Sequence, residues 1–140
     1  MRTCCAGSFA GGVSMILIFG GAYQGKLEYA KKRLNAQDLD VFSCKDDDVS
    51  LPEGKAIIDE IDKWILALLR EDRDVQKEMM RLVDNDRNAI ITCNDISCGV
   101  VPIEPIMRKW REEVGRALAF LAAESDEVVR LYCGLATRLK

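Results

Sequence analysis

The sequence predicts an α/β fold in which a mostly parallel sheet carries helices on both faces. Short, continuous apolar runs alternate along the chain with longer segments whose apolar residues recur at helical spacing. Strands that alternate with helices favour a parallel sheet joined by right-handed crossovers. A glycine-rich turn between the first apolar run and the first helical segment is the third observation, and it indicates where the chemistry lies.

The first elements follow from composition and pattern. Residues 15–19, MILIF, form a short apolar run that is typical of a buried parallel strand. Residues 25–36 suit a helix, because basic side chains separate the apolar ones. Residues 39–44 alternate and contain β-forming residues, so they predict a second strand. The polar segment 45–54, with a proline and a glycine, predicts a loop.

The middle of the chain continues this order. Residues 56–59 predict a short third strand. Two helices are expected at 60–70 and 72–84, where the apolar residues lie at helical spacing. Residues 88–93, NAIITC, predict a fourth buried strand.

The last third completes a three-layer sandwich. Residues 94–105 predict a loop, and residues 106–123 a helix with one apolar stripe. Residues 127–133 predict a fifth strand, Gly134 turns the chain, and residues 135–139 predict a final hairpin strand. The stripe consists of Ile106, Trp110, Val114, Ala117, Leu118 and Leu121.

The length of 140 residues fits one compact domain, which we place at residues 15–140. Residues 1–14 lack the apolar region of a signal peptide. We interpret them as an N-terminal extension, with Met15 as the natural start. The apolar run at 15–19 is too short to span a bilayer.

Composition excludes several function classes. The net charge of −3 argues against a broad electrostatic grip on nucleic acid or anionic lipid, although a local cationic pocket is compatible with it. The chain has no histidine, and its six cysteines lack zinc-binding spacing. We therefore expect a cytoplasmic protein whose thiols are buried or incidental, with no membrane span and no nucleic-acid partner.

The turn after the first strand matches the pattern G-x-x-x-x-G-K and predicts a phosphate-binding loop, as in P-loop NTPases. Backbone N–H groups would surround the phosphate, and the helix N-terminus adds partial positive charge. The alternative is a glycine-rich turn with a chance lysine. We expect Lys26 to reach the outer phosphates and to serve catalysis. The predicted nucleotide-binding residues here are Gly20, Gly21, Ala22, Tyr23, Gln24, Gly25, Lys26 and Leu27.

Magnesium binding is weakened by the residue that follows Lys26. A serine or threonine hydroxyl normally binds Mg²⁺ at this position, and Leu27 has none. Asp59, at the end of the third strand, is the predicted metal ligand and second catalytic residue. Glu60 and Asp62 are neighbouring candidates for that role. The alternative for Asp59 is a cap on the following helix.

Four segments together resemble one enzyme family. GGAYQGKLEYAKK (20–32) resembles the opening loop of the adenosylcobinamide kinase/adenosylcobinamide-phosphate guanylyltransferase family. AIIDEIDKWILALL (56–69) is similar to its acidic strand and following helix. CNDISCGVVP (93–102) and residues 108–140 are similar to its second half. The resemblance spans residues 15–140, with a gap after residue 44.

The resemblance implies a P-loop fold and two reactions. A nucleoside triphosphate, GTP or ATP with Mg²⁺, phosphorylates the aminopropanol hydroxyl of adenosylcobinamide. GMP is then transferred from GTP to that phosphate through a covalent intermediate on histidine. The resemblance also implies a homotrimer.

This chain departs from the family pattern in its catalytic equipment. It has no histidine, so the covalent step cannot use its usual residue. Residues 45–54 stand where the family has a further helix and strand, and Leu27 replaces a hydroxyl. The expected function is phosphoryl transfer to adenosylcobinamide in cobalamin biosynthesis without the histidine–GMP step. The alternative is a catalytically inactive nucleotide-binding, regulatory or structural homologue.

Three more residues are predicted to bind nucleotide. Asn94 and Asp95 follow a strand at the end where doubly wound sheets bind ligands, and the alternative for them is an Asx turn. Arg108 lies two turns before Arg116 on one helix face. Either arginine could bind phosphate or pair with Glu112, which lies four residues from each.

Overall fold

The computed structural model describes residues 15–34, 40–51, 54–96 and 100–140. The predicted N-terminal extension, residues 1–14, lies outside this part of the chain. The elements are, in chain order, β1 (Ile16–Gly20), α1 (Lys26–Leu34), β2 (Val41–Ser43), β3 (Ile57–Asp59), α2 (Ile61–Arg70), α3 (Val75–Asn85), β4 (Ile90–Asn94), α4 (Pro105–Glu124), β5 (Glu127–Tyr132) and β6 (Leu135–Arg138).

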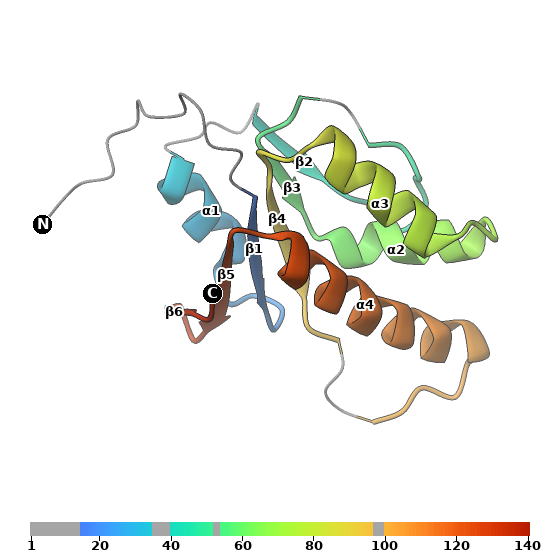
Figure 1. Ribbon diagram of the computed structural model, residues 1–140. Coiled ribbons are helices and arrows are strands. Elements are labelled where there is room, and N and C mark those ends of the chain that lie inside the picture. Colours follow the sequence, from blue (N-terminus) through green and yellow to red (C-terminus); the bar gives the residue numbers. More distant parts are fainter. Residues whose placement is uncertain (1–14, 35–39, 52–53, 97–99) are drawn as a thin grey trace, which may run out of the picture.

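The strands form one six-stranded sheet in the order β2-β3-β4-β1-β5-β6 (Figure 1). Every neighbouring pair is parallel except β5 and β6, which form the predicted C-terminal hairpin. The first strand therefore lies inside the sheet, between β4 and β5. This arrangement confirms the predicted α/β, P-loop-like fold.

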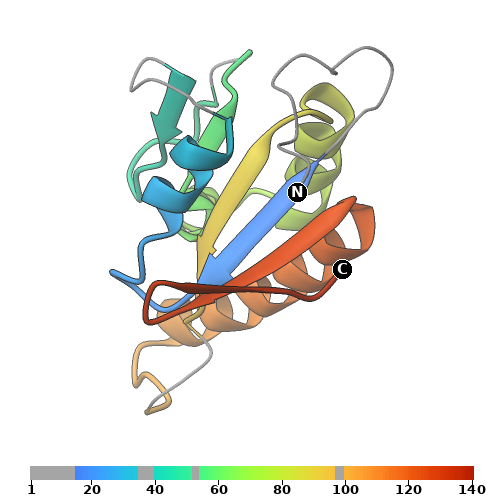
Figure 2. The same ribbon diagram turned by 90° about the vertical axis from the view of Figure 1, so that its left-hand side faces the viewer.

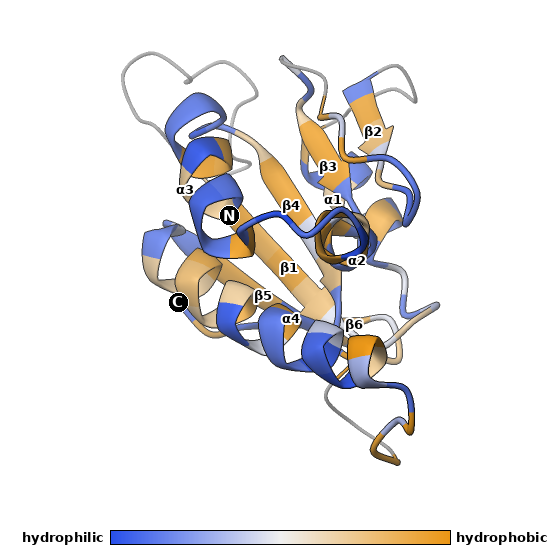
Figure 3. Cartoon of the chain, turned by 90° about the vertical axis from the view of Figure 1, so that its right-hand side faces the viewer, coloured by the Kyte–Doolittle hydropathy of each residue, from blue (hydrophilic) through white to orange (hydrophobic). Residues whose placement is uncertain are grey.

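Helices cover both faces of the sheet, as predicted. Helix α1 lies on one face, and α2, α3 and α4 lie on the other (Figures 1 and 2). Alternate residues of β1 enter different cores: Leu17 packs with α2–α4, whereas Ile18 packs toward α1. Figure 3 shows apolar residues along the central strands and hydrophilic residues on the outer faces of the helices.

Two helices begin later than predicted, for local reasons. Helix α3 starts at Val75 and not at residue 72, because the Asp74 side chain accepts a hydrogen bond from the Lys77 amide and caps the helix. Helix α2 starts at Ile61, because Glu60 has a left-handed backbone with φ of 56°. No helix in the described residues is both long and apolar enough to cross a membrane.

Helix α4 packs against the sheet along only part of its length. Val114, Ala117 and Leu121 are buried, but Ile106 is 37% exposed and Trp110 is partly exposed. The predicted stripe is thus fully buried only from Val114 onward, while Trp110 packs against the edge of the core. The first half of the helix projects beyond the sheet and is free to line a cavity (Figure 1).

Gly20 generates a stability prediction. It lies in register with Asn94 of β4 and Leu131 of β5, and an added Cβ would lie 2.3 Å from the Leu131 carbonyl oxygen. We expect Gly20→Ala to lower the free energy of unfolding by about 1–3 kcal/mol, because backbone must shift to relieve the clash. Urea unfolding measures this change.

The matched control for this prediction is Gly115→Ala in α4, where a Cβ meets nothing within 4 Å. That variant should be more stable by about 0.5–1 kcal/mol, because alanine is the better helix former. Equal effects of the two substitutions would contradict the role assigned to Gly20.

Candidate functional site

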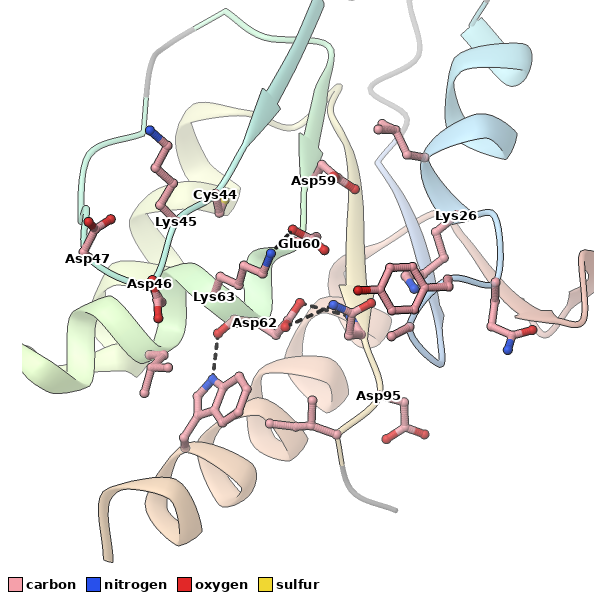
Figure 4. A pocket seen from close by; sticks show the side chains of 18 of the residues that line it. Lys26, Cys44, Lys45, Asp46, Asp47, Asp59, Glu60, Asp62, Lys63 and Asp95 are labelled. Atoms are coloured by element: carbon pink, nitrogen blue, oxygen red, sulfur yellow. Dashed lines mark hydrogen bonds and ion pairs between the residues drawn. The ribbon is translucent and has the colours of Figure 1, made fainter. Parts of the chain in front are cut away.

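A cavity of about 1020 Å³ opens at the carboxyl edge of the parallel strands (Figure 4). Its walls come from the predicted phosphate loop, the ends of β3 and β4, the start of α2 and the first half of α4. Ligands of open α/β sheets bind at this edge. The cavity therefore lies where the fold would place a substrate.

The loop between β1 and α1 is sharply curved. Tyr23 and Gly25 both have positive φ, 58° and 87°, and the Tyr29 amide donates to the Gly25 carbonyl as α1 begins. The Gln24 side chain accepts a hydrogen bond from the Cys133 amide, in the turn between β5 and β6. The hairpin thus holds the loop from outside. A curved backbone that leads into a helix N-terminus is suited to anions.

Lys26 points into the protein and not into solvent. Its side chain is buried, and its Nζ atom donates to the Gly21 carbonyl oxygen at 2.6 Å. Burial lowers the pKa of Lys26, while the nearby carboxylates of Asp62 and Asp59 act in the opposite direction. The ammonium group is therefore fixed at the base of the loop.

Asp59 ends β3 beside Lys26 and is buried. Its Oδ1 atom accepts a hydrogen bond of 2.6 Å from the Thr92 hydroxyl of β4. The same hydroxyl accepts from the Glu60 amide at 2.9 Å, so Thr92 holds both acidic residues. Burial raises the pKa of Asp59. The alternative role as helix cap does not apply here, because Glu60 occupies the N-cap position of α2.

Asp62 is the acid that the sequence indicated only as a neighbouring candidate. It is 2% exposed, and its two carboxylate oxygens accept from the backbone N and side-chain Nδ2 of Asn94 at 3.1 and 3.3 Å. Its carbonyl oxygen accepts from Trp110 Nε1 at 2.7 Å. Burial raises the pKa of Asp62. This residue joins α2, β4 and α4, and the Asn94 side chain makes this contact in place of an Asx turn.

The remaining predicted residues divide between the cavity and the surface. Asp95 lines the cavity, and its amide donates to the Gly20 carbonyl oxygen at 2.8 Å. Arg108 is not among the residues that line it, and its predicted role in nucleotide binding stays a prediction. Its side chain donates to the Ile103 carbonyl at the start of α4. Arg116 pairs with Glu112 at 2.7 Å, as one alternative predicted.

Sequence reasoning missed Thr92 and Lys63. Thr92 was hidden inside an apolar strand, and Lys63 looked like an ordinary polar position of a helix. A usable signal existed for the acid nearby: Asp62 and Lys63 are the two charged residues in a stretch from Ile61 to Leu68 that is otherwise apolar. A charge in such a helix is rarely buried without a partner.

The residues present offer few ligands to a metal ion. Leu27 lines the cavity and packs with the apolar residues on the α1 face, and its hydrocarbon side chain has no oxygen to offer a metal. Among the described residues, no group of three or more histidine, cysteine, aspartate or glutamate side chains is arranged to hold a metal. Asp59, at the end of β3 and in the wall of the cavity, can contribute a carboxylate oxygen. Magnesium commonly uses one or two carboxylates together with substrate phosphates.

The sheet order, the strand–loop–helix motif and the buried lysine define a P-loop-like α/β protein. The family model for cobinamide kinase / cobinamide phosphate guanyltransferase matches residues 41–139, well over half of the chain. The chain belongs to that family. The match begins beyond the phosphate loop, so the loop rests on its own motif and geometry. No individual curated protein matches the chain.

Asp62 generates a prediction on pH dependence. Because its pKa is raised in the folded state, its contribution to stability is present below its ordinary pKa and is lost as pH rises through the raised value. Relative to Asp62→Asn, the unaltered protein should therefore lose unfolding free energy as pH rises above about 4, the ordinary pKa of an aspartate. Urea unfolding at a series of pH values measures the difference.

Asp48 provides the opposite case. Hydrogen bonds from Ser50 lower the pKa of this exposed residue, so its contribution should be lost as pH falls. Asp48→Asn should thus change the pH profile in the other direction. An Asp62→Asn profile parallel to that of the unaltered protein would show that the buried carboxyl does not titrate as described.

Proposed function

We propose that this protein binds GTP or ATP through the loop at residues 20–26 and transfers a phosphoryl group to the hydroxyl of adenosylcobinamide, a step of cobalamin biosynthesis. One observation carries the proposal: the buried ammonium of Lys26 lies at the base of a curved glycine loop that opens into the large cavity. Membership of the cobinamide kinase / cobinamide phosphate guanyltransferase family supports the choice of acceptor.

The residues have separate tasks in this proposal. The loop amides and the N-terminus of α1 would bind the outer phosphates, and Lys26 would neutralise the charge that develops during transfer. Asp59 would hold a magnesium ion that arrives with the nucleotide, and the ion would supply further charge neutralisation. Asp62 would keep the Asn94 amide and Trp110 in place at the acceptor side.

The second family reaction requires a nucleophile that this chain does not offer in the usual form. There is no histidine in the sequence. Burial raises the pKa of the thiols of Cys44 and Cys93, so neither is activated. We infer that the covalent GMP step is lost and that phosphoryl transfer alone remains.

A second candidate function is a nucleotide-binding homologue without catalysis, in a regulatory or structural role. The apolar Leu27 favours it, because the loop lacks the hydroxyl that normally binds magnesium. For either candidate we propose a homotrimer from the resemblance and a cytoplasmic location from the composition of the chain.

Turnover tests the main proposal. Incubation with GTP or ATP, Mg²⁺ and adenosylcobinamide should give phosphorylated adenosylcobinamide, and the intact mass of the protein should show no added GMP. Lys26→Ala should weaken triphosphate binding roughly ten- to hundredfold, because a charge-assisted contact is lost. Binding without turnover would favour the second candidate, and unchanged affinity in Lys26→Ala would sink both.

Leu27 allows a separate test of magnesium. Leu27→Ser restores a hydroxyl beside Lys26 and should raise the Mg²⁺-dependent affinity for triphosphate by roughly tenfold. Leu34→Ser is the matched control, because Leu34 lies on the same helix and packs on the same face away from the cavity. Calorimetric titration with and without Mg²⁺ measures both, and equal responses would mean that position 27 does not face the metal.

A further inference from the structure

Acidic residues outnumber basic residues in the wall of the cavity, and Lys26 alone does not balance them. Seven acidic and four basic residues of the described chain line it, so an incoming triphosphate meets more negative than positive charge. Leu27 weakens the usual recruitment of magnesium. Tight binding of a triphosphate therefore requires another cation that can reach its outer phosphates.

Lys63 is placed to supply that charge. It lies in the first turn of α2, lines the same cavity as Lys26, and its side chain is 44% exposed. Both lysines feel the charges of the same three acids, Asp59, Glu60 and Asp62. Figure 4 shows these acids at the cavity wall, with Lys63 approaching from α2 and Lys26 from the loop.

Lys63 forms an ion pair with Glu60 that is partly exposed and can be broken easily. Its Nζ atom lies 2.5 Å from Glu60 Oε2, three residues earlier, and the Glu60 side chain is 31% exposed. Partly exposed ion pairs of this kind contribute little to stability. A charge-assisted hydrogen bond to a phosphate is stronger. Exchange of Glu60 for a phosphate oxygen is therefore favourable.

Glu60 itself stays in place during such an exchange. Its backbone is left-handed, with φ of 56°, and its amide donates to Thr92 in β4. A non-glycine residue held in this conformation stores strain, which is often found at functional sites. The Glu60 backbone is thus held by β4, whereas the long Lys63 side chain can depart from its partner.

We propose that Lys63 is a second phosphate-binding cation, which leaves Glu60 and contacts the terminal phosphate of a nucleoside triphosphate bound at the loop. This inference rests on the proposed function. It adds a preference for nucleoside triphosphates over nucleoside monophosphates. Lys63 takes over part of the charge neutralisation that position 27 cannot support.

Two substitutions break the same ion pair and separate this role from a structural one. Lys63→Met should weaken binding of GTP or ATP, measured without Mg²⁺, by about tenfold, and should change GMP or AMP binding by less than about twofold. Glu60→Gln releases Lys63 and should bind triphosphate as tightly as the unaltered protein or more tightly. Lys63→Arg keeps the charge and should retain most of the affinity.

Lys77→Met, on the exposed surface of α3, controls for the loss of one positive charge and should change affinity by less than about twofold. Weakening by both Lys63→Met and Glu60→Gln would show a structural pair and overturn the inference. So would unchanged triphosphate affinity in Lys63→Met, or an equal loss for monophosphates. Thermal unfolding of each variant confirms that the fold is intact.

The same titrations separate failure of this inference from failure of the proposed function. If the unaltered protein binds no triphosphate, the proposed function fails and the role of Lys63 fails with it. If the unaltered protein binds and Lys26→Ala weakens binding, but Lys63→Met does not, only the role of Lys63 is overturned.

Discussion

The site depends on one buried arrangement of charge: the ammonium of Lys26, hydrogen-bonded to the Gly21 carbonyl and set close to two buried carboxylates. An isolated charge in such a place would be costly. Here Thr92 satisfies Asp59, and Asn94 satisfies Asp62, through hydrogen bonds from β4. The sheet edge and α2 are thus joined by hydrogen bonds to buried carboxylates, and the Lys26 ammonium lies beside them at the base of the loop.

The same arrangement explains why most of the fold, but only part of the site, was predictable from sequence. Apolar runs and helical spacing located each strand and helix to within a few residues, because burial on two faces of a sheet leaves a strong pattern. The predicted start of α3 is wrong because the Asp74 side chain caps the helix, which therefore begins at Val75. Local hydrogen bonds of this kind decide where a periodic segment actually begins.

The sequence also placed the loop and Asp59 at the same edge of the sheet, since a glycine motif and a strand-end acid are local features; their roles toward nucleotide and metal stay predictions. Thr92 and Lys63 were not found, because their importance comes from neighbours 32 or 33 residues away or from a cavity that no single segment reveals. Arg108 is a different case. Its position on a helix face predicts a phosphate ligand, and in the structure its side chain donates to the Ile103 carbonyl outside the cavity, so its role in nucleotide binding stays a prediction.

The position of β1 in the sheet has a consequence for folding during synthesis. Ile16 of β1 pairs with Ile90 of β4 and with Glu127 of β5. Strand β1 is therefore synthesised well before both of its partner strands. Contacts so distant along the chain slow folding, because the entropy of closing long loops is lost before the stabilising contacts form. During synthesis, β1 could complete its pairing only after Glu127 and the rest of β5 had left the ribosome.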